Sequence, residues 1–406
     1  MKCAIAITQN CNLACDYCYI DKENNVMTLT TAKKIIDFIF NKSQENEEIE
    51  IGFFGGEPLL EFNLIKKITD VIHNHPSYDS ARTEVSVVTN GTIMSNEIID
   101  FLEQKKIGIG ISCDGPSRIQ DSHRRFPDGR GSSKIVEKNI KKAIHHFPFM
   151  PVNSVFSPEN LDSLPDVIDY FDNLGVKNIY LNHNISADWS EKDAIILPKT
   201  FNSLAEKYMG FYKNEDPKYI SIIDSKIAVI LRGGYKPQEM CRMGLHEFGF
   251  APTGNIYPCE RLIGSDDGIR HCIGNINIGM KTYNASLTDP NFVTNEECQE
   301  CTLNKYCMNW CGCTNYYSTK NYNRVGPFTC ALEKAAISAA YKVINTLSEE
   351  GLHFSDHLAG TPLMSIIGEV VKDKKRILNC LHRYTYHLTG FVNKLNKLYM
   401  IKYEFI

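Results

Sequence analysis

The sequence predicts an α/β fold in which a parallel sheet curls into a partial (β/α)6 barrel, followed by a small cysteine-rich domain and a helical tail. Three observations predict it. Short β-rich runs alternate six times with helical segments in the first half of the chain, residues 241–330 contain many Gly, Cys and Asn without long periodic segments, and residues 331–406 are again helical in pattern. Right-handed crossovers curl a sheet of six β–α units into a full or partial barrel.

The six predicted strands are short runs rich in β-branched and apolar residues, at 3–8, 49–54, 84–89, 107–112, 152–156 and 177–182. Each precedes a segment of helical periodicity, at 30–41, 59–75, 96–104, 133–146, 161–174 and 198–212. We therefore expect a barrel, a linker with one short helix, a cysteine-rich domain and a helical C-terminal extension, at 1–215, 216–240, 241–330 and 331–406. Active sites of such barrels lie at the C-terminal ends of the strands, where the motifs discussed below occur.

The composition narrows the class of protein. The 406 residues are 43% hydrophobic and 23% charged, as in an ordinary soluble globular protein, and the net charge of −4 argues against a nucleic-acid partner. The chain has no apolar run long enough for a membrane span and no signal peptide at its N-terminus, so we expect no membrane partner and a cytoplasmic location. Fifteen cysteines in such a chain indicate metal or redox chemistry rather than disulfides.

Three of these cysteines follow the first predicted strand with the spacing Cys11-x3-Cys15-x2-Cys18. Three thiolates on a tight loop can ligate three irons of a [4Fe–4S] cluster and leave the fourth iron open to an exchangeable ligand. Tyr17, directly before the last cysteine, can pack on an adenine ring. A zinc knuckle is the alternative, but structural zinc sites close with four ligands, and no fourth Cys or His follows nearby.

This cysteine pattern resembles the signature of the radical S-adenosylmethionine (SAM) superfamily, and Gly55-Gly56-Glu57-Pro58 resembles its second motif, whose backbone carbonyls receive the SAM amino group. The resemblance covers residues 1–215 and implies a partial, TIM-like (β/α)6 barrel. It also implies that the open iron chelates SAM and that a reductant such as a ferredoxin or flavodoxin drives SAM cleavage. The products are methionine and a 5′-deoxyadenosyl radical, which abstracts a hydrogen atom from the substrate.

Four further residues are candidates for the SAM or substrate site. Asn90 and Ser112 resemble positions that line this site in the family. Arg124 can pair with the SAM carboxylate, because a guanidinium matches carboxylate geometry, or it can be a solvated loop arginine. Leu181, near the end of the sixth strand, can pack on adenine or serve as an ordinary core leucine.

A second set of seven cysteines resembles the SPASM domain, a C-terminal extension of radical SAM enzymes that carries auxiliary iron–sulfur clusters. The resemblance places four of them on an outer cluster, namely Cys298, Cys301, Cys307 and Cys330. It places the other three on an inner cluster, namely Cys241, Cys259 and Cys311. Zinc is the rival interpretation, because paired cysteines also form zinc ribbons.

The inner cluster lacks one ligand. Three [4Fe–4S] clusters, one of them with an open iron for SAM, require eleven cysteines, whereas the two motifs supply ten. Sulfatase-maturating relatives supply the missing cysteine just upstream of the Cys241 position, but residues 231–237 contain none. Cys272 is a candidate ligand, an open iron is the alternative, and Cys313 is disfavoured because it lies two residues after an assigned ligand. The remaining cysteines, Cys3, Cys113 and Cys380, are interpreted as ordinary thiols.

The resemblance implies an enzyme that modifies a peptide or protein substrate. We expect a maturase that forms a thioether or carbon–carbon cross-link, or an oxidised residue, in a ribosomally made peptide. Anaerobic sulfatase maturation, which forms formylglycine, is an alternative, and a non-catalytic iron–sulfur or zinc protein for electron transfer or structure is another. Sulfatase-maturating enzymes carry a catalytic aspartate after the Cys259 position and a glutamine before Thr-Asn-Gly-Thr. At these two positions this chain has Glu260 and Val88, respectively. Glu260 is a candidate base, or it can pair with Arg261.

One segment of the sequence is a candidate for recognition of a leader peptide. Residues 372–404 are rich in Lys and Arg and can dock an acidic leader, or they can be a solvated helical face. The chain starts directly with the first predicted strand, so we expect no separate leader-binding domain before the barrel.

Overall fold

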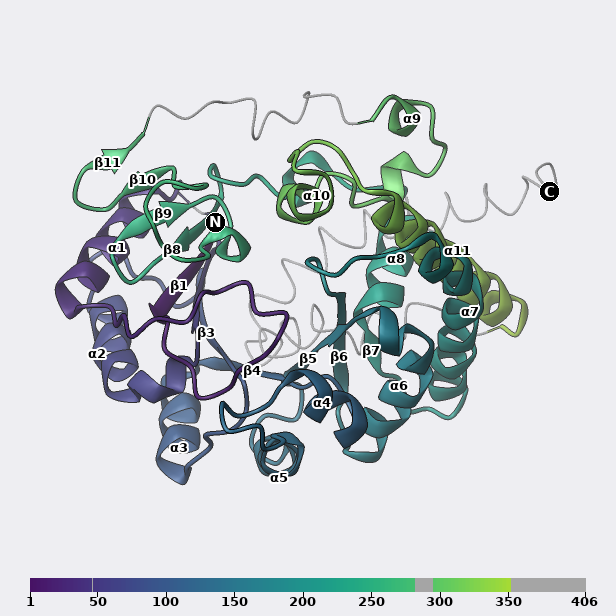
Figure 1. Ribbon diagram of the computed structural model, residues 1–406, viewed down its shortest axis with the longest axis horizontal. Helices are drawn as coiled ribbons and strands as arrows, with labels where there is room; N and C mark the ends of the chain where they lie inside the picture. The colour runs from purple at the N-terminus through teal and green to yellow at the C-terminus, as the bar shows by residue number, and fades with distance from the viewer. Residues whose placement is uncertain (46, 282–294, 352–406) are drawn as a thin grey trace, which may run out of the picture. The chain divides into compact units, whose positions relative to one another are not determined.

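The computed structural model describes residues 1–45, 47–281 and 295–351, and its sheet has the strand order β11-β10-β9-β8-β1-β2-β3-β4-β5-β6-β7. The first six strands are parallel and lie within two residues of the predicted bounds (Figure 1). They are β1 (Lys2–Thr8), β2 (Ile49–Gly55), β3 (Thr83–Thr89), β4 (Gly108–Ser112), β5 (Pro151–Phe156) and β6 (Asn178–His183).

The barrel is not closed. β1 pairs with β2 and β8, and β6 pairs with β5 and with β7 (Tyr219–Ile220), so no pairing within the described residues joins β1 to β6. An arc of helices covers the outside of these strands in Figure 1. It comprises α1 (Leu29–Lys42), α2 (Phe62–His73), α3 (Asn96–Lys105), α5 (Ser133–Ile144), α6 (Leu164–Asn173) and α7 (Glu191–Lys213). The prediction of a partial (β/α)6 barrel is confirmed.

Each helix is explained by its sequence pattern, as α1 illustrates. Thr28 caps its N-terminus, because the hydroxyl accepts a hydrogen bond from the backbone nitrogen of Thr31 at 3.0 Å. Ile35, Ile36 and Ile39 are fully buried and form the apolar stripe that faces the sheet. The helix α7 begins at Glu191, earlier than predicted, because Ser190 and Asp193 form a capping box and the helix tolerates Pro198 in its interior.

The cysteine-rich region continues the sheet of the barrel. β8 (Glu247–Phe250) pairs in parallel with β1, and β9 (Asn255–Tyr257), β10 (Gly274–Asn275) and β11 (Gly279–Met280) extend the sheet in antiparallel fashion. Phe248 and Phe250 are buried, and Phe38 of α1 packs edge-on against both rings. This region therefore shares part of its core with the barrel.

Two helices join the cysteine-rich region to the end of the barrel. α8 (Ser221–Arg232) lies in the predicted linker and α11 (Pro327–Glu349) contacts both α7 and α8. Buried Lys226 of α8 forms an ion pair of 2.6 Å with Glu333 of α11, which also accepts a hydrogen bond from the backbone nitrogen of Met308 at 2.6 Å. Residues Met1–Glu349 form one compact unit, and the domain limits at 215, 240 and 330 stay predictions.

Part of the predicted helical tail is observed, since α11 continues to Glu349. The Lys- and Arg-rich segment 372–404 and Cys380 lie outside the described residues.

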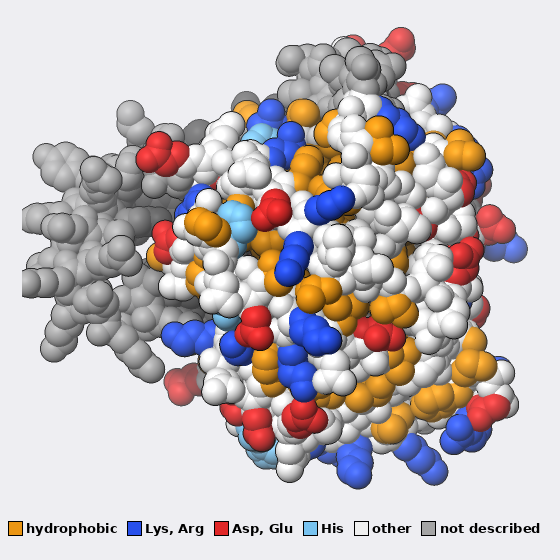
Figure 2. All heavy atoms as spheres, turned by 90° about the vertical axis from the view of Figure 1, so that its left-hand side faces the viewer, with side chains coloured by type: hydrophobic (Ala, Val, Ile, Leu, Met, Phe, Trp, Pro, Cys, Tyr) orange, Lys and Arg blue, Asp and Glu red, His pale blue; other side chains and the backbone are white. Residues whose placement is uncertain are grey.

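Three short helices were not predicted, α4 (Ser117–His123), α9 (Glu296–Gln299) and α10 (Gly312–Thr319). Among the described helices, none is long and apolar enough to cross a membrane. Acidic and basic side chains are interspersed on the face shown in Figure 2.

Candidate functional site

The loop that follows β1 carries the first cysteine set. Cys11, Cys15 and Cys18 line a cavity of about 360 Å³ at the C-terminal ends of the barrel strands. Burial raises the pKa of Cys11 and raises that of Cys15 to about 11, so these thiols are protonated near neutral pH when nothing binds them. A metal group that binds here must therefore displace protons.

Two glycines let the end of β2 lie against this loop. A Cβ atom on Gly55 would lie 2.2 Å from the carbonyl oxygen of Thr8, and one on Gly56 would lie 2.2 Å from that of Asn10. The backbone nitrogen of Gly56 donates to Thr8 at 2.8 Å, and that of Glu57 donates to Asn10 at 2.9 Å. Only glycine permits this close approach of two backbones, and φ of +132° at Gly55 requires it as well.

The side chain of Glu57 lies beneath the cavity and does not line it. It is fully buried, and its oxygens accept hydrogen bonds from the Leu59 nitrogen at 3.0 Å, the Thr89 hydroxyl at 2.8 Å and the Asn90 nitrogen at 2.7 Å. Burial raises its pKa to about 7, although these hydrogen bonds oppose the shift. Glu57 thus holds the ends of β2 and β3 together, and Pro58 next to it is buried at the start of a short 3-10 helix.

Asn90 connects the end of β3 to the first cysteine. Its side-chain nitrogen donates to the sulfur of Cys11 at 3.7 Å and to Asn12 at 2.8 Å. The backbone nitrogen of Leu13 donates to the same sulfur at 3.4 Å. Hydrogen bonds to a cluster sulfur are one of the means by which a protein sets the reduction potential of a cluster.

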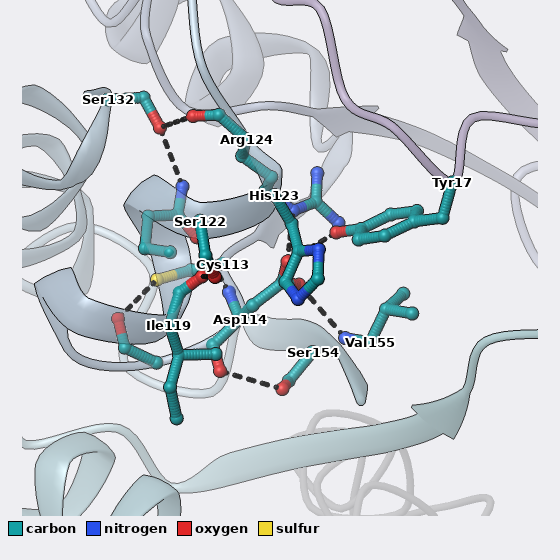
Figure 3. Close-up of polar contacts among 12 residues, drawn as sticks. Tyr17, Cys113, Asp114, Ile119, Ser122, His123, Arg124, Ser132, Ser154 and Val155 are labelled. Atoms are coloured by element: carbon teal, nitrogen blue, oxygen red, sulfur yellow. Dashed lines mark hydrogen bonds and ion pairs between the residues drawn. The ribbon is translucent and has the colours of Figure 1, made fainter. Parts of the chain in front are cut away.

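The buried carboxylate of Asp114 contacts both Arg124 and Tyr17 (Figure 3). The Nε atom of Arg124 lies 3.0 Å from Oδ2 of Asp114, and the hydroxyl of Tyr17 donates to the same oxygen. The guanidinium lies 5.3 Å from the centre of the Tyr17 ring, and the backbone nitrogen of Val155 donates to Oδ1 of Asp114 at 3.0 Å. Arg124 lines the cavity and is buried beside Asp114, so it is not a solvated loop arginine, whereas its pairing with the SAM carboxylate stays a prediction.

The other predicted residues divide between two cavities. Ser112 lines the cavity of the first cysteine set, whereas Leu181 is only 3% exposed and lines a larger neighbouring cavity instead. Its position supports the reading as a core leucine of β6. The interior wall of the barrel is mostly uncharged: Val88, 36% exposed, and Asn153 face the first cavity.

The larger cavity has a volume of about 980 Å³ and contains the predicted inner set. Cys241, Cys259 and Cys311 line it together with Cys313. Cys272 does not, because its thiol donates to the carbonyl oxygen of Gly274 at 3.1 Å inside an apolar cluster. The position of Cys272 thus opposes its prediction as a ligand.

Four residues line both cavities and form a shared wall, namely Asn182, His183, Glu260 and Arg261. Burial lowers the pKa of His183 to about 4, with Arg261 adding to the effect, so the imidazole is neutral at physiological pH. Glu260 is partly buried, and its Oε2 lies 3.4 Å from the sulfur of Cys259. Glu260 is thus placed between the two cysteine sets.

A third cavity, of about 510 Å³, contains the predicted outer set. Its lining includes Cys298, Cys301, Cys307 and Cys330. The folded chain thus gathers each predicted cysteine set around a separate cavity. Within the described residues no three Cys, His, Asp or Glu side chains converge closely enough to hold a single metal ion, so these sets are not preformed tetrahedral zinc sites.

Comparison with known proteins agrees with this geometry. Residues 5–171 match the Radical SAM superfamily model. An uncharacterized protein of Methanocaldococcus jannaschii is 31% identical over 279 residues, which cover 67% of this chain and 87% of that protein. The chain belongs to the radical SAM superfamily. It is accordingly an enzyme that uses a [4Fe–4S] cluster and SAM.

Other relatives of this radical SAM enzyme have named activities. The radical SAM cyclopropyl synthase TigE of Paramaledivibacter caminithermalis is 26% identical over 76% of this chain and 66% of that protein. A cysteine-type anaerobic sulfatase-maturating enzyme of Clostridium novyi is 25% identical over 75% of this chain and 85% of that protein. The structure of native anSMEcpe with bound AdoMet and Cp18Cys peptide superposes on this chain with a TM-score of 0.73 and 20% identity. The match covers 86% of this chain and 99% of that chain. That likeness establishes the fold.

Several site residues were not predicted from the sequence. Asp114 lies two residues after the end of β4, and this position after a predicted strand was the only indication in the sequence that it belongs to the site. Arg261 and His183 became visible only when the fold placed the ends of β6 and β9 next to each other around one cavity. Cys313 was predicted to be an improbable ligand, yet it lies with the inner set.

Proposed function

We propose that this radical SAM enzyme matures a ribosomally made peptide by forming a thioether or carbon–carbon cross-link, or an oxidised residue. The observation that carries the proposal is the shared wall of Asn182, His183, Glu260 and Arg261, which borders both the cavity of the first cysteine set and the larger cavity of the inner set. A substrate segment bound at this wall lies between the two predicted redox centres.

In this proposal Cys11, Cys15 and Cys18 hold the SAM-binding cluster. When bound, the cluster and SAM supply the 5′-deoxyadenosyl radical that removes a hydrogen atom from the substrate. Gly55 and Gly56 present backbone to the ligand, with Glu57 and Pro58 holding that loop in place. Tyr17, Asn90, Ser112 and Arg124 are among the other residues that line this cavity.

The outer and inner sets hold two auxiliary clusters in the same proposal. The thiols fit such groups, because each set surrounds a cavity of several hundred cubic ångströms and the sulfurs are not arranged for one ion. Thiolates are the ordinary protein ligands of [4Fe–4S] clusters. When bound, such clusters would supply an acceptor for the electron that the substrate releases.

The step at the substrate requires a base as well as an electron acceptor. A new C–S or C–C bond forms when the substrate loses a hydrogen atom to the radical, a proton to a base and an electron to an acceptor. Glu260 is the carboxylate of the shared wall, so we assign it the proton. Arg261 follows it in the chain and interacts electrostatically with it.

A peptide substrate is favoured by what named relatives do and by the lining of the barrel. Streptococcus suis SuiB has been solved bound to precursor peptide SuiA. This chain superposes on that structure with a TM-score of 0.56 and 14% identity, over 81% of this chain and 75% of SuiB. Bacillus subtilis AlbA, 25% identical over 62% of this chain and 53% of that protein, is a subtilosin biosynthesis protein. The uncharged wall around Val88 and Asn153 suits an uncharged peptide side chain.

Sulfatase maturation is the second candidate, because the superposition on anSMEcpe covers 99% of that chain. Val88 and Glu260, in place of the glutamine and aspartate of sulfatase-maturating enzymes, disfavour it. The non-catalytic alternative is not supported, since the chain belongs to an enzyme superfamily.

The test is the mass of a peptide after anaerobic incubation with the reconstituted enzyme, SAM and a flavodoxin or dithionite. Candidate peptides are those encoded beside the gene, and a cysteine-containing sulfatase peptide is tested in parallel. A mass decrease of two hydrogen atoms per bond formed, absent with Cys18→Ala, supports the cross-linking maturase. Formylglycine in the sulfatase peptide, with the neighbouring peptides unmodified, contradicts it.

A further inference from the structure

We propose that Cys313 is the fourth protein ligand of the inner auxiliary cluster, together with Cys241, Cys259 and Cys311. The inference rests on the proposed function to the extent that it assumes an iron–sulfur cluster in this cavity. It fills the one ligand position that the two cysteine motifs leave open.

The position of Cys313 carries the proposal. Its side chain is 3% exposed, and its sulfur lies 3.7 Å from that of Cys311. It packs in one buried cluster with Cys259, and all three line the same cavity as Cys241. Four thiols from three separate segments of the chain therefore line one cavity.

The start of α10 explains why two cysteines so close in sequence share a cavity. Cys311 is the N-cap of α10 and Cys313 lies in its first turn. Gly312 between them allows a close approach, since a Cβ atom there would lie 2.7 Å from the terminal methyl carbon of Met243, two residues after Cys241. The side chain of Asn315 fixes this turn by donating to the carbonyl oxygen of Asn309 at 2.8 Å.

Polar groups around these sulfurs suit ligation of a cluster. The hydroxyl of Thr314 lies 3.3 Å from the sulfur of Cys311. Arg261 interacts electrostatically with Cys313, Cys311 and Cys259, so a positive charge faces the thiolates. Hydrogen bonds and charges around the sulfurs are among the means by which a protein tunes a bound cluster.

The other candidates for this ligand position are less well placed. The thiol of Cys272 is occupied by Gly274 and packs among Ala6, Ile20 and Tyr257, outside the cavity. Glu247 does line the cavity, with Oε2 at 2.9 Å from the sulfur of Cys241, but thiolates bind cluster iron in preference to carboxylates.

A fourth cysteine has a consequence for the reaction. A cluster whose four irons are all bound by cysteines has no open position, so the substrate does not coordinate it. The inner cluster then acts in electron transfer only, and the substrate is held by protein groups such as those of the shared wall. An open iron, the alternative drawn from the sequence, predicts direct binding of a substrate thiol.

The experiment uses the full chain with Cys11, Cys15 and Cys18 replaced by Ala, so that only auxiliary clusters bind. After anaerobic reconstitution this background should hold about eight irons, with Cys313→Ala losing between one and four of them. Cys272→Ala is the matched control, because it removes another buried thiol of the same region, and it should leave the iron content unchanged. Circular dichroism before and after reconstitution shows whether each variant is folded.

A second variant keeps the test decisive where Cys313→Ala fails to fold. Cys313→Ser retains the side-chain volume and offers an oxygen ligand, so the electron paramagnetic resonance spectrum of the reduced inner cluster should shift, while Cys272→Ser should not shift it. Full iron content and an unchanged spectrum in both Cys313 variants would overturn the proposal. A background protein with no bound iron, while the parent chain still cleaves SAM, would overturn the auxiliary clusters and this ligand but not the SAM chemistry.

Discussion

The buried carboxylate of Glu57 accepts a hydrogen bond of 2.7 Å from the backbone nitrogen of Asn90, which joins the glycine motif after β2 to the end of β3. Asn90 in turn donates to the sulfur of Cys11 at 3.7 Å. The two sequence motifs are therefore mechanically connected, because a shift of the loop at Glu57 displaces the residue that contacts the first cysteine.

Gly56→Ala should prevent assembly of the SAM-binding cluster. The new methyl group would lie 2.2 Å from the carbonyl oxygen of Asn10, and a backbone atom cannot move aside as a flexible side chain can. The expected loss is about four irons per chain, together with all SAM cleavage. Gly210→Ala in α7 is the control, since nothing lies within 4 Å of its added methyl group, and it should keep both. Full iron in the Gly56 variant would show that the close approach is dispensable.

Stability should depend on pH through Glu57. Its folded-state pKa is raised from 4.5 to about 7 by burial, so the folded chain keeps a proton that the unfolded chain loses. The contribution of Glu57 is therefore fully present below about pH 4.5 and falls as the pH rises toward about 7. Urea denaturation across this range gives the free energy of unfolding of the metal-free parent protein and of Glu57→Gln. The advantage of the parent protein in this free energy should shrink as the pH rises. A difference that grows instead contradicts the raised pKa.

Asp114→Asn should destabilise the barrel by about 3–5 kcal/mol, because it leaves the buried guanidinium of Arg124 without its counter-charge. The measurement is the free energy of unfolding of the metal-free protein. Asp128→Asn, which breaks the exposed pair with Arg130, is the matched control and should leave the unfolding midpoint unchanged. Equal effects of the two substitutions would mean that Arg124 finds another partner.

Glu260→Gln should lower peptide modification by about 100-fold or more, as expected for loss of a general base. Formation of 5′-deoxyadenosine and the iron content should stay at parent levels, because Glu260 belongs to the shared wall and to no predicted cysteine set. Glu296→Gln at the exposed start of α9 is the control and should change neither quantity. Unchanged modification by Glu260→Gln ends its assignment as the base.

The fold and the cysteine sets were predictable because they depend on local pattern. Alternating β-rich and helical periods located all six barrel strands. The family resemblance assigned the cysteines to three sets, and each set lines its own cavity. The pairing of β8 with β1 could not be predicted in this way, since it joins residues about 245 positions apart in a strand of only four residues.

Side-chain partners were less predictable than secondary structure. The location of Arg124 depends on Asp114, a residue from another element, and therefore on how α4 packs beside β4. The place of Cys313 beside Cys311 was not predicted, because Gly312 and its polar neighbours give no helical signal and the first turn of α10 could not be located. In both cases the folded backbone decides which side chains meet.

The central claim is that the loop of Cys11, Cys15 and Cys18 and the glycine motif together hold a cluster and SAM for radical chemistry. The most direct measurement is the 5′-deoxyadenosine formed when the anaerobically reconstituted enzyme is reduced with dithionite in the presence of SAM. We predict that the parent chain forms this product and that Cys15→Ala, which keeps the two auxiliary cysteine sets, forms none. A parent protein that carries its full iron content and yields no 5′-deoxyadenosine, or a Cys15→Ala variant that yields as much as the parent, would contradict the account.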